Sequence, residues 1–168
     1  MKGLEPMSQP NERPRRAASL SKANQVHIVM PMDVNASYHL FGGRLMEWID
    51  VVAAVAAKRH CHSEVLTAAV DHLSFLAPAN LGDTVELVGR VTYVGNTSME
   101  VCVETWVEYF GSEHDAKLVN RAYLTMVALD DNGKPTQVPM LDLQTEQEKR
   151  DFEEGRQRRE VRKRLKMQ

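Results

Sequence analysis

The sequence predicts an α+β domain in which a curved antiparallel sheet of five to six strands wraps around one long central helix. Three observations support this prediction. One segment has the apolar spacing of a helix, five segments have strand character, and turn residues separate neighbouring strands. A single helix that follows the first strand and precedes the other four must bury its apolar face against the sheet.

Length and composition limit the class of protein. The 168 residues, of which 43% are hydrophobic, suit one domain with a substantial core. The 21 basic and 23 acidic residues leave a formal net charge of −2, so composition gives no general attraction to nucleic acid. Residues 1–24 lack the apolar core of a signal peptide, and no later window resembles a membrane span. We therefore expect a cytoplasmic protein without a nucleic-acid partner and without membrane insertion.

The chain divides into three parts by composition. Residues 1–23 are rich in Pro, Arg, Ser and Asn without apolar periodicity, which predicts a disordered arm. Residues 24–143 form the single domain. Residues 144–168 carry acids early and bases late, as suits the dipole of a helix. We expect this last part to be a solvated helix or tail that frays after Gly155.

The central helix is predicted to begin at Gly42 and Gly43 and to continue to about His60. Its apolar residues recur at spacings of three and four, which is the pattern of one helix face. They are Leu45, Ile49, Val52, Ala53 and Ala56. The small alanine side chains would let the helix lie close to a sheet.

The strands are predicted from alternating or β-branched runs. The first runs from Val26 to Met32. Four more follow the helix, within residues 64–78, 83–95, 98–109 and 117–134. Between the third and fourth of the five lies the turn "GNTS", where Gly95 and Asn96 are expected to adopt positive φ and form a hairpin.

Asp50 is the first candidate for chemistry. It lies in an apolar neighbourhood of the helix, where a buried carboxylate without a partner would be costly. Gly43 precedes it by seven residues, about two turns, so both residues lie on one side of the helix. The helix N-terminus offers unpaired N–H donors, and a carboxylate can activate water or act as a nucleophile. From the residues alone, a tight turn at the glycines and a structural role for Asp50 remain open.

Metal sites and several common catalytic motifs are not expected in this sequence. His60, Cys61 and His62 are adjacent at a helix end and cannot all face one ion, so no metal site is expected. The sequence also lacks a G-x-S-x-G elbow, a P-loop and a G-x-G-x-x-G motif after a strand. A serine hydrolase of the α/β type is therefore disfavoured.

Four blocks of the sequence resemble the hotdog-fold acyl-CoA thioesterases, specifically the cytosolic or brain-type acyl-CoA hydrolases and their bacterial single-domain relatives. The blocks are "LFGGRLMEWIDVVAAVAAKRHC", "VLTAAVDHLSFLAPANLGDTVEL", "VGNTSMEVCVETWVE" and "LTMVALDDNGKPTQVPML". The resemblance extends from about Val26 to Glu154. It implies a hotdog fold and an enzyme that hydrolyses acyl-CoA to a fatty acid and free coenzyme A. No cofactor is implied, because coenzyme A is part of the substrate.

The resemblance also implies site residues. The N–H groups of Gly42 and Gly43 would polarise the thioester carbonyl, and Asp50 would be the catalytic carboxylate. In the preceding loop Asn35 is kept, but Tyr38 and His39 replace a glycine and an Asn or Asp of many relatives. That Asn reaches the active site of the partner subunit, so His39 is a candidate for the same role.

The hairpin residues Asn96, Thr97 and Ser98 correspond to a segment that contacts coenzyme A in the family. The resemblance further implies a homodimer, assembled into a hexamer as a trimer of dimers. Two other functions remain open. The altered "SYH" loop favours a non-catalytic module that binds or senses acyl-CoA, and His39 leaves a hotdog dehydratase as a third possibility.

Overall fold

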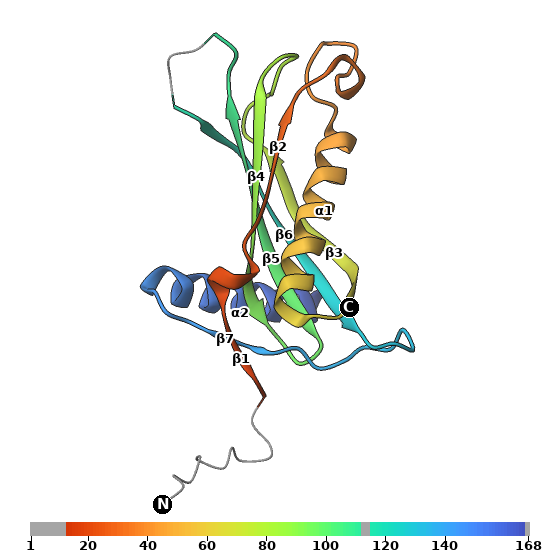
Figure 1. Ribbon diagram of the computed structural model, residues 1–168, viewed down its shortest axis with the longest axis vertical. Helices are drawn as coiled ribbons and strands as arrows, with labels where there is room; N and C mark the ends of the chain where they lie inside the picture. The colour runs from red at the N-terminus through yellow and green to blue at the C-terminus, as the bar shows by residue number, and fades with distance from the viewer. Residues whose placement is uncertain (1–12, 112–114, 167–168) are drawn as a thin grey trace, which may run out of the picture.

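The protein is a five-stranded antiparallel sheet with one long helix on each face, as the computed structural model of residues 13–111 and 115–166 shows (Figure 1). The elements in chain order are β1 (Arg15–Ala17), η1 (Ala18–Ser21), β2 (Ala23–Ile28), η2 (Pro31–Asp33), α1 (Gly42–Cys61), β3 (Glu64–Phe75), β4 (Thr84–Val94), β5 (Ser98–Glu108), β6 (Lys117–Leu129), β7 (Met140–Asp142) and α2 (Glu146–Lys166). The sheet order is β2-β4-β5-β6-β3. The predicted α+β hotdog fold is therefore confirmed.

Helix α1 lies close against the concave face of the sheet because small residues meet at the contact. Ala53, Ala56 and Ala57 on the helix are fully buried. On β4, a Cβ added at Gly89 would come within 2.7 Å of Cγ1 of Val52. Glycine at this position thus allows the close approach of helix and sheet.

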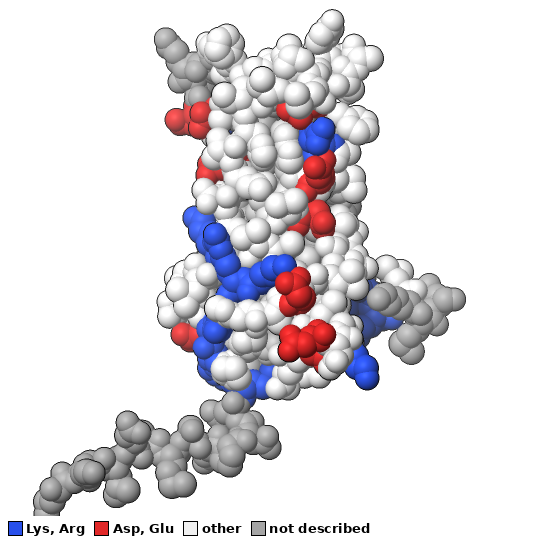
Figure 2. All heavy atoms as spheres, turned by 45° about the vertical axis from the view of Figure 1, so that its right-hand side comes forward, with Lys and Arg blue, Asp and Glu red and all other residues white. Residues whose placement is uncertain are grey.

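Strand β3 is a free edge of the sheet. It pairs with β6 on one side and has bulges after Thr67 and after Asp71. Leu66 and Val70 on this strand are exposed, as are Val51 and Val55 on the adjacent α1. Figure 2 shows that Lys and Arg gather mainly in the lower half of the face toward the viewer, whereas the upper half is mostly white with scattered acidic side chains. The sheet thus covers one face of α1 and leaves part of the helix beside β3 exposed in a single chain.

Helix α2 packs across the face of the sheet opposite α1, which differs from the expected solvated, fraying tail. Gly155 is buried, and a Cβ there would meet Tyr93 at 2.6 Å and the Glu100 carboxylate at 2.8 Å. The Glu100 side chain is 1% exposed and accepts hydrogen bonds from Arg158 at 2.8 and 3.0 Å. A buried carboxylate on β5 therefore holds a helix that has few apolar residues of its own.

The predicted disordered arm of residues 1–23 differs from the structure wherever residues are described. Residues 1–12 lie outside the described residues, but residues 15–21 form β1 and η1, and Ala23 begins β2. Strand β1 pairs in parallel with β7, and Arg13 donates hydrogen bonds to the carbonyls of Gly95 and Val138. These contacts join segments more than 80 residues apart, which local composition does not reveal.

The β4–β5 hairpin is confirmed, but the expected positive φ at Gly95 and Asn96 is wrong. Positive φ occurs elsewhere among the described residues, at Tyr38, His62 and three other glycines. An added Cβ at Gly95 would lie 3.1 Å from Oγ of Ser98, a tight contact that a small shift of the serine side chain would relieve. In the described residues, neither long helix is apolar enough over a sufficient length to cross a bilayer.

Candidate active site

The loop before α1 is fixed by its own hydrogen bonds. The Asn35 Oδ1 accepts the backbone N–H groups of Ser37 and His39, at 2.9 and 3.2 Å. Tyr38 adopts φ of 59°, the left-handed conformation that glycine tolerates best. This is the position where the resemblance places a glycine, so Tyr38 keeps the loop conformation at a cost in backbone strain.

Asp33 holds the start of α1. Its backbone carbonyl accepts the Phe41 N–H at 2.8 Å, and its buried carboxylate lies 3.2 Å from the Arg44 guanidinium. Phe41 is the N-cap residue and provides no side-chain acceptor. The chain therefore enters the helix in a fixed direction without capping its first donors.

The N–H groups of Gly42 and Gly43 remain available. Among the described residues, no acceptor forms a hydrogen bond with either of them, whereas Arg44 and Leu45 donate to the Phe41 carbonyl. A Cβ on Gly43 would lie 2.6 Å from the Phe41 ring, so a side chain there would displace the ring. The helix start thus presents uncapped donors with partial positive charge, which is the arrangement that stabilises a developing oxyanion.

Asp50 and Gly43 line the same groove between α1 and β3. The groove has a volume of about 300 Å³ and is otherwise lined mainly by apolar side chains, including Val70 and Leu73. The Thr67 hydroxyl donates a hydrogen bond of 2.6 Å to Oδ1 of Asp50. The two-turn spacing therefore brings the glycine end and the carboxylate to one surface, as the sequence predicted.

The expected burial of Asp50 is wrong for the single chain, since the residue is exposed. Its side chain emerges beside the free β3 edge, among the exposed apolar residues of α1 and β3. Burial of this carboxylate would require another molecule to cover the groove.

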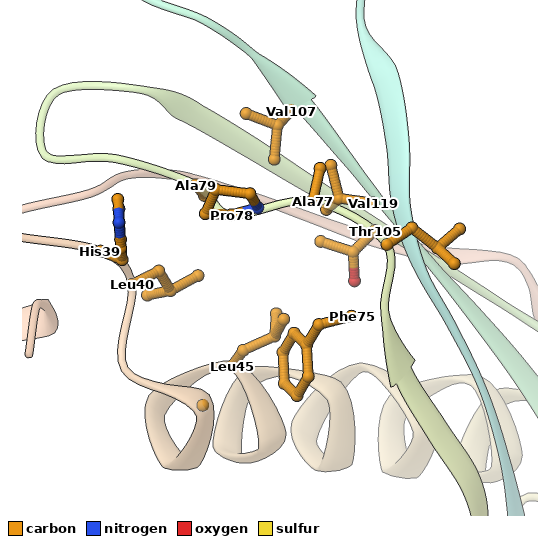
Figure 3. A pocket seen from close by; sticks show the side chains of 12 residues that line it. His39, Leu40, Leu45, Phe75, Ala77, Pro78, Ala79, Thr105, Val107 and Val119 are labelled. Atoms are coloured by element: carbon orange, nitrogen blue, oxygen red, sulfur yellow. The ribbon is translucent and has the colours of Figure 1, made fainter.

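A second cavity opens on the other side of the helix start (Figure 3). It has a volume of about 400 Å³ and lies between α1 and the ends of β3, β5 and β6. Its lining is mainly apolar and includes Gly42, Leu45, Phe75 and Val107, and the polar side chains in it are His39 and Thr105. The cavity and the groove thus reach the helix N-terminus from two sides.

His39 lines the mouth of this cavity and is exposed. Its Nδ1 lies 2.8 Å from Oδ1 of Asn80, so Nδ1–H donates a hydrogen bond to this carbonyl oxygen. Nε2 is then the nitrogen available to a ligand. The structure brings His39 and Gly42 to one cavity, and the role of His39 stays a prediction.

The structure does not bring the remaining candidates to this site within one chain. Asn35 lines none of the described cavities, and its carbonyl side-chain oxygen is engaged in the loop. Asn96, Thr97 and Ser98 lie at the opposite end of β5 from Val107, about 30 Å away at the usual rise of a strand. A role of these hairpin residues in coenzyme A contact stays a prediction that would need another chain.

Sequence reasoning missed Thr67 and Thr105. Thr67 lies on β3 with no periodic signal that marks it. Thr105 could have been found from the sequence, because its hydroxyl interrupts the apolar inward-facing residues of β5. The other residues of that row include Val101, Val103 and Val107. Within residues 13–111 and 115–166, no group of three or more His, Cys, Asp or Glu side chains is placed to hold a metal ion.

Comparisons with known proteins agree with this geometry. The Thioesterase superfamily model matches residues 38–109. An uncharacterized acyl-CoA thioester hydrolase of Bacillus subtilis is 43% identical over 76% of this chain and 74% of its own length. The cytosolic acyl coenzyme A thioester hydrolase of Rattus norvegicus is 36% identical over 83% of this chain, which spans 37% of that longer protein.

Solved structures are similar over nearly the whole chain. An acyl-CoA hydrolase of Staphylococcus aureus, in complex with butyryl coenzyme A and coenzyme A, has a TM-score of 0.86 at 38% identity. The alignment covers 92% of this chain and 93% of that one. Structures of the same enzyme exist with alanine at an asparagine, at an aspartate and at a threonine. A hexameric acyl-CoA thioesterase is 39% identical and has a TM-score of 0.86. The alignment covers 90% of this chain and 97% of that one.

Proposed function

Because this chain belongs to the acyl-CoA thioester hydrolases of the thioesterase superfamily, we propose that it hydrolyses acyl-CoA to a fatty acid and free coenzyme A. The observation that carries the proposal is the shared groove of Asp50 and Gly43. A carboxylate and uncapped helix donors on one surface are the two groups that thioester hydrolysis requires.

In the proposed reaction, the Asp50 carboxylate takes a proton from water as the water oxygen attacks the thioester carbonyl carbon. The N–H groups of Gly42 and Gly43 stabilise the negative charge that develops on the carbonyl oxygen. The C–S bond then breaks, and the proton held by Asp50 passes to the departing coenzyme A sulfur. Thr67 holds one oxygen of the carboxylate, which leaves the other oxygen for the water.

The spacing of polar residues supports this assignment. In the Staphylococcus aureus enzyme, the asparagine and the aspartate replaced by alanine are 15 residues apart, and the aspartate and the threonine are 17 apart. Asn35, Asp50 and Thr67 have the same separations here. We assign the three to one active site, with Asn35 contributed by a second chain because Asn35 does not line the groove of its own chain.

We propose a homodimer formed through β3, which would extend the sheet and cover Asp50. The exposed β3 edge carries Leu66 and Val70, and a long apolar edge strand requires a partner to avoid aggregation. A second apolar surface lies at the other edge of the sheet, where Val26 and Ile28 are exposed on β2. This second surface suits assembly of dimers into a hexamer, as in the hexameric relative.

Two variants separate these contacts. Light scattering of the wild-type protein should give six times the chain mass of 19.0 kDa. Leu66→Glu should disrupt the β3 contact and abolish activity with the dimer, whereas Val26→Glu should leave an active dimer. A wild-type monomer that is fully active would overturn the proposed assembly.

We also propose a cytoplasmic site of action on acyl-CoA, and the cytosolic acyl coenzyme A thioester hydrolase among the relatives supports it. The direct test is thiol release by the purified wild-type protein from acyl-CoAs of increasing chain length. Turnover on at least one chain length supports the proposal. Saturable binding of acyl-CoA without release of thiol on every chain length would identify a binding module instead.

A further inference from the structure

The cavity at Gly42 contains one fully buried hydroxyl group that has no partner. Thr105 is 0% exposed, and its Oγ1 forms no hydrogen bond in the structure. The residue lines the cavity, and Figure 3 shows its oxygen directed into the space toward Leu45 and Phe75. A buried hydroxyl without a partner is costly, so its retention in an apolar wall needs an explanation.

The strand geometry explains how Thr105 comes to face the cavity. The ladder of β5 and β6 pairs Thr105 with Asn120 and Trp106 with Leu118, so Val119 is an extra residue between them. Such a bulge redirects side chains and is frequent beside functional sites. Val119 and Thr105 both line the cavity as a result.

Asn120 is a polar residue of β6 that pairs directly with Thr105 of β5. Its Nδ2 donates a hydrogen bond of 2.6 Å to the Ser74 carbonyl, which fixes the orientation of the amide. Its Oδ1 is buried and has no partner. Side chains directly opposite on antiparallel strands have Cβ atoms about 5 Å apart, so Asn120 lies beside Thr105 but behind the cavity lining, of which it is not a part.

We propose that Thr105 forms a hydrogen bond with a hydroxyl group on the acyl chain of the substrate. The enzyme would then prefer hydroxylated acyl-CoAs over saturated ones of equal length. The inference rests on the proposed thioesterase function. The acyl chain enters the cavity from the thioester held at Gly42. A substrate hydroxyl can accept a hydrogen bond from Thr105, whereas a saturated chain leaves the Thr105 hydroxyl unpaired.

The position of Thr105 indicates which carbon carries the hydroxyl. Thr105 faces Leu45, which is one helical turn beyond Gly42, so it meets the first carbons after the carbonyl. A 3-hydroxyacyl chain fits this depth. The experiment therefore compares 3-hydroxyhexanoyl-CoA with hexanoyl-CoA, using whichever hydroxyl enantiomer the wild type prefers.

The measured quantity is the ratio of kcat/KM for the hydroxylated substrate to kcat/KM for the saturated one. Thr105→Val keeps the shape of the side chain and removes the hydroxyl, so it should lower this ratio about tenfold, the effect of one buried hydrogen bond. Thr105→Ser retains the hydroxyl and should keep the ratio. Thr125→Val is the matched control, because the Thr125 hydroxyl is also unpaired but lines a pocket beside α2.

The outcomes separate this inference from the proposed function. If the wild type hydrolyses neither of these substrates nor an acyl-CoA of any other chain length, the thioesterase proposal fails. If it hydrolyses them but Thr105→Val changes the ratio less than threefold, the hydroxyl merely holds a water molecule and the inference is overturned. A tenfold loss in Thr105→Val alone, with Thr125→Val unchanged, supports it.

Discussion

The Thr67 hydroxyl donates a hydrogen bond of 2.6 Å to Oδ1 of Asp50 and thereby connects the edge strand β3 to the central helix α1. Asp50 lines the groove in which Gly43 also lies. Because the carboxylate is held by one oxygen, its other oxygen keeps a fixed direction. Thr67 is therefore a positioning residue for the proposed base.

Loss of this hydrogen bond should reduce turnover more than binding. A hydrogen bond to a charged group contributes about 1.5–3 kcal/mol, so Thr67→Val should lower kcat about ten- to a hundredfold. KM should change less than threefold, because Thr67 does not contact the bulk of the substrate. Steady-state kinetics of thiol release measure both constants. Thr67→Ser should restore most of the rate, and a Ser variant as slow as the Val variant would exclude a hydrogen-bond role.

Replacement of Tyr38 by glycine should stabilise the protein. Tyr38 has φ of 59° and a side chain that is 69% exposed, so it incurs backbone strain and contributes little packing. Relief of about 1 kcal/mol of strain should raise Tm by about 2–4 °C. Ser37→Gly is the control, since Ser37 does not have a positive φ, and it should not raise Tm. Thermal unfolding that gives equal shifts for both variants would show that the left-handed conformation is not the cause.

The buried Glu100 should be required for docking of α2. Its carboxylate accepts hydrogen bonds from Thr92, Arg158 and Arg162. Glu100→Gln leaves two guanidinium groups without their buried partner, but both remain partly exposed and can rehydrate. We expect a loss of about 2 kcal/mol and a Tm about 4–8 °C lower.

The control for this variant lies on the exposed face of α2. Glu153 pairs with Arg156 at the surface, where an ion pair contributes little, so Glu153→Gln should leave Tm unchanged. Limited proteolysis should release the C-terminal helix faster in Glu100→Gln than in Glu153→Gln. Equal proteolysis and equal Tm in the two variants would contradict the docking role.

His60 should make the protein less stable in acid. Burial lowers the pKa of His60 below its usual value, while its Nε2–H donates to the Pro139 carbonyl at 3.0 Å. Below about pH 6.5 the unfolded chain takes up a proton that the folded chain resists, so stability is present above this pH and declines below it. One such proton lowers the free energy of unfolding by at most about 1.4 kcal/mol per pH unit.

Urea unfolding at pH 7.5 and pH 5.5 measures this effect. His60→Gln can still donate to the Pro139 carbonyl but cannot be protonated, so the difference between the two pH values should shrink. Part of the difference should remain, because burial also lowers the pKa of His27. An unchanged difference in the variant would show that His60 does not carry the acid sensitivity.

The fold was largely predictable because its main elements have strong local periodicity. The α1 start at Gly42 and the β4–β5 hairpin follow from residue spacing and turn chemistry. The docking of α2 was not predictable, since it depends on a buried Glu100 and two arginines 58 and 62 residues away. The β1–β7 pairing was not predictable either, because the pairing of strands distant in sequence leaves no periodic pattern in either segment.

The candidate site was predictable in part for a similar reason. Gly43 and Asp50 lie about two turns apart on one helix, so helical geometry predicts that they share a surface. The exposure of Asp50 depends on where the sheet ends, which the sequence pattern does not show. Thr67 comes from another element, and its role becomes visible only when β3 is placed beside α1.

The central claim, that Asp50 is the catalytic base, is tested most directly by thiol release from the best wild-type substrate by Asp50→Asn and Glu47→Gln. Glu47 lies one turn earlier on α1, lines the same groove and pairs with Arg44. We predict that Asp50→Asn loses at least a hundredfold in kcat while it still binds acyl-CoA and keeps its oligomeric state, and that Glu47→Gln stays within threefold of the wild type. Turnover by Asp50→Asn near the wild-type rate would contradict the claim.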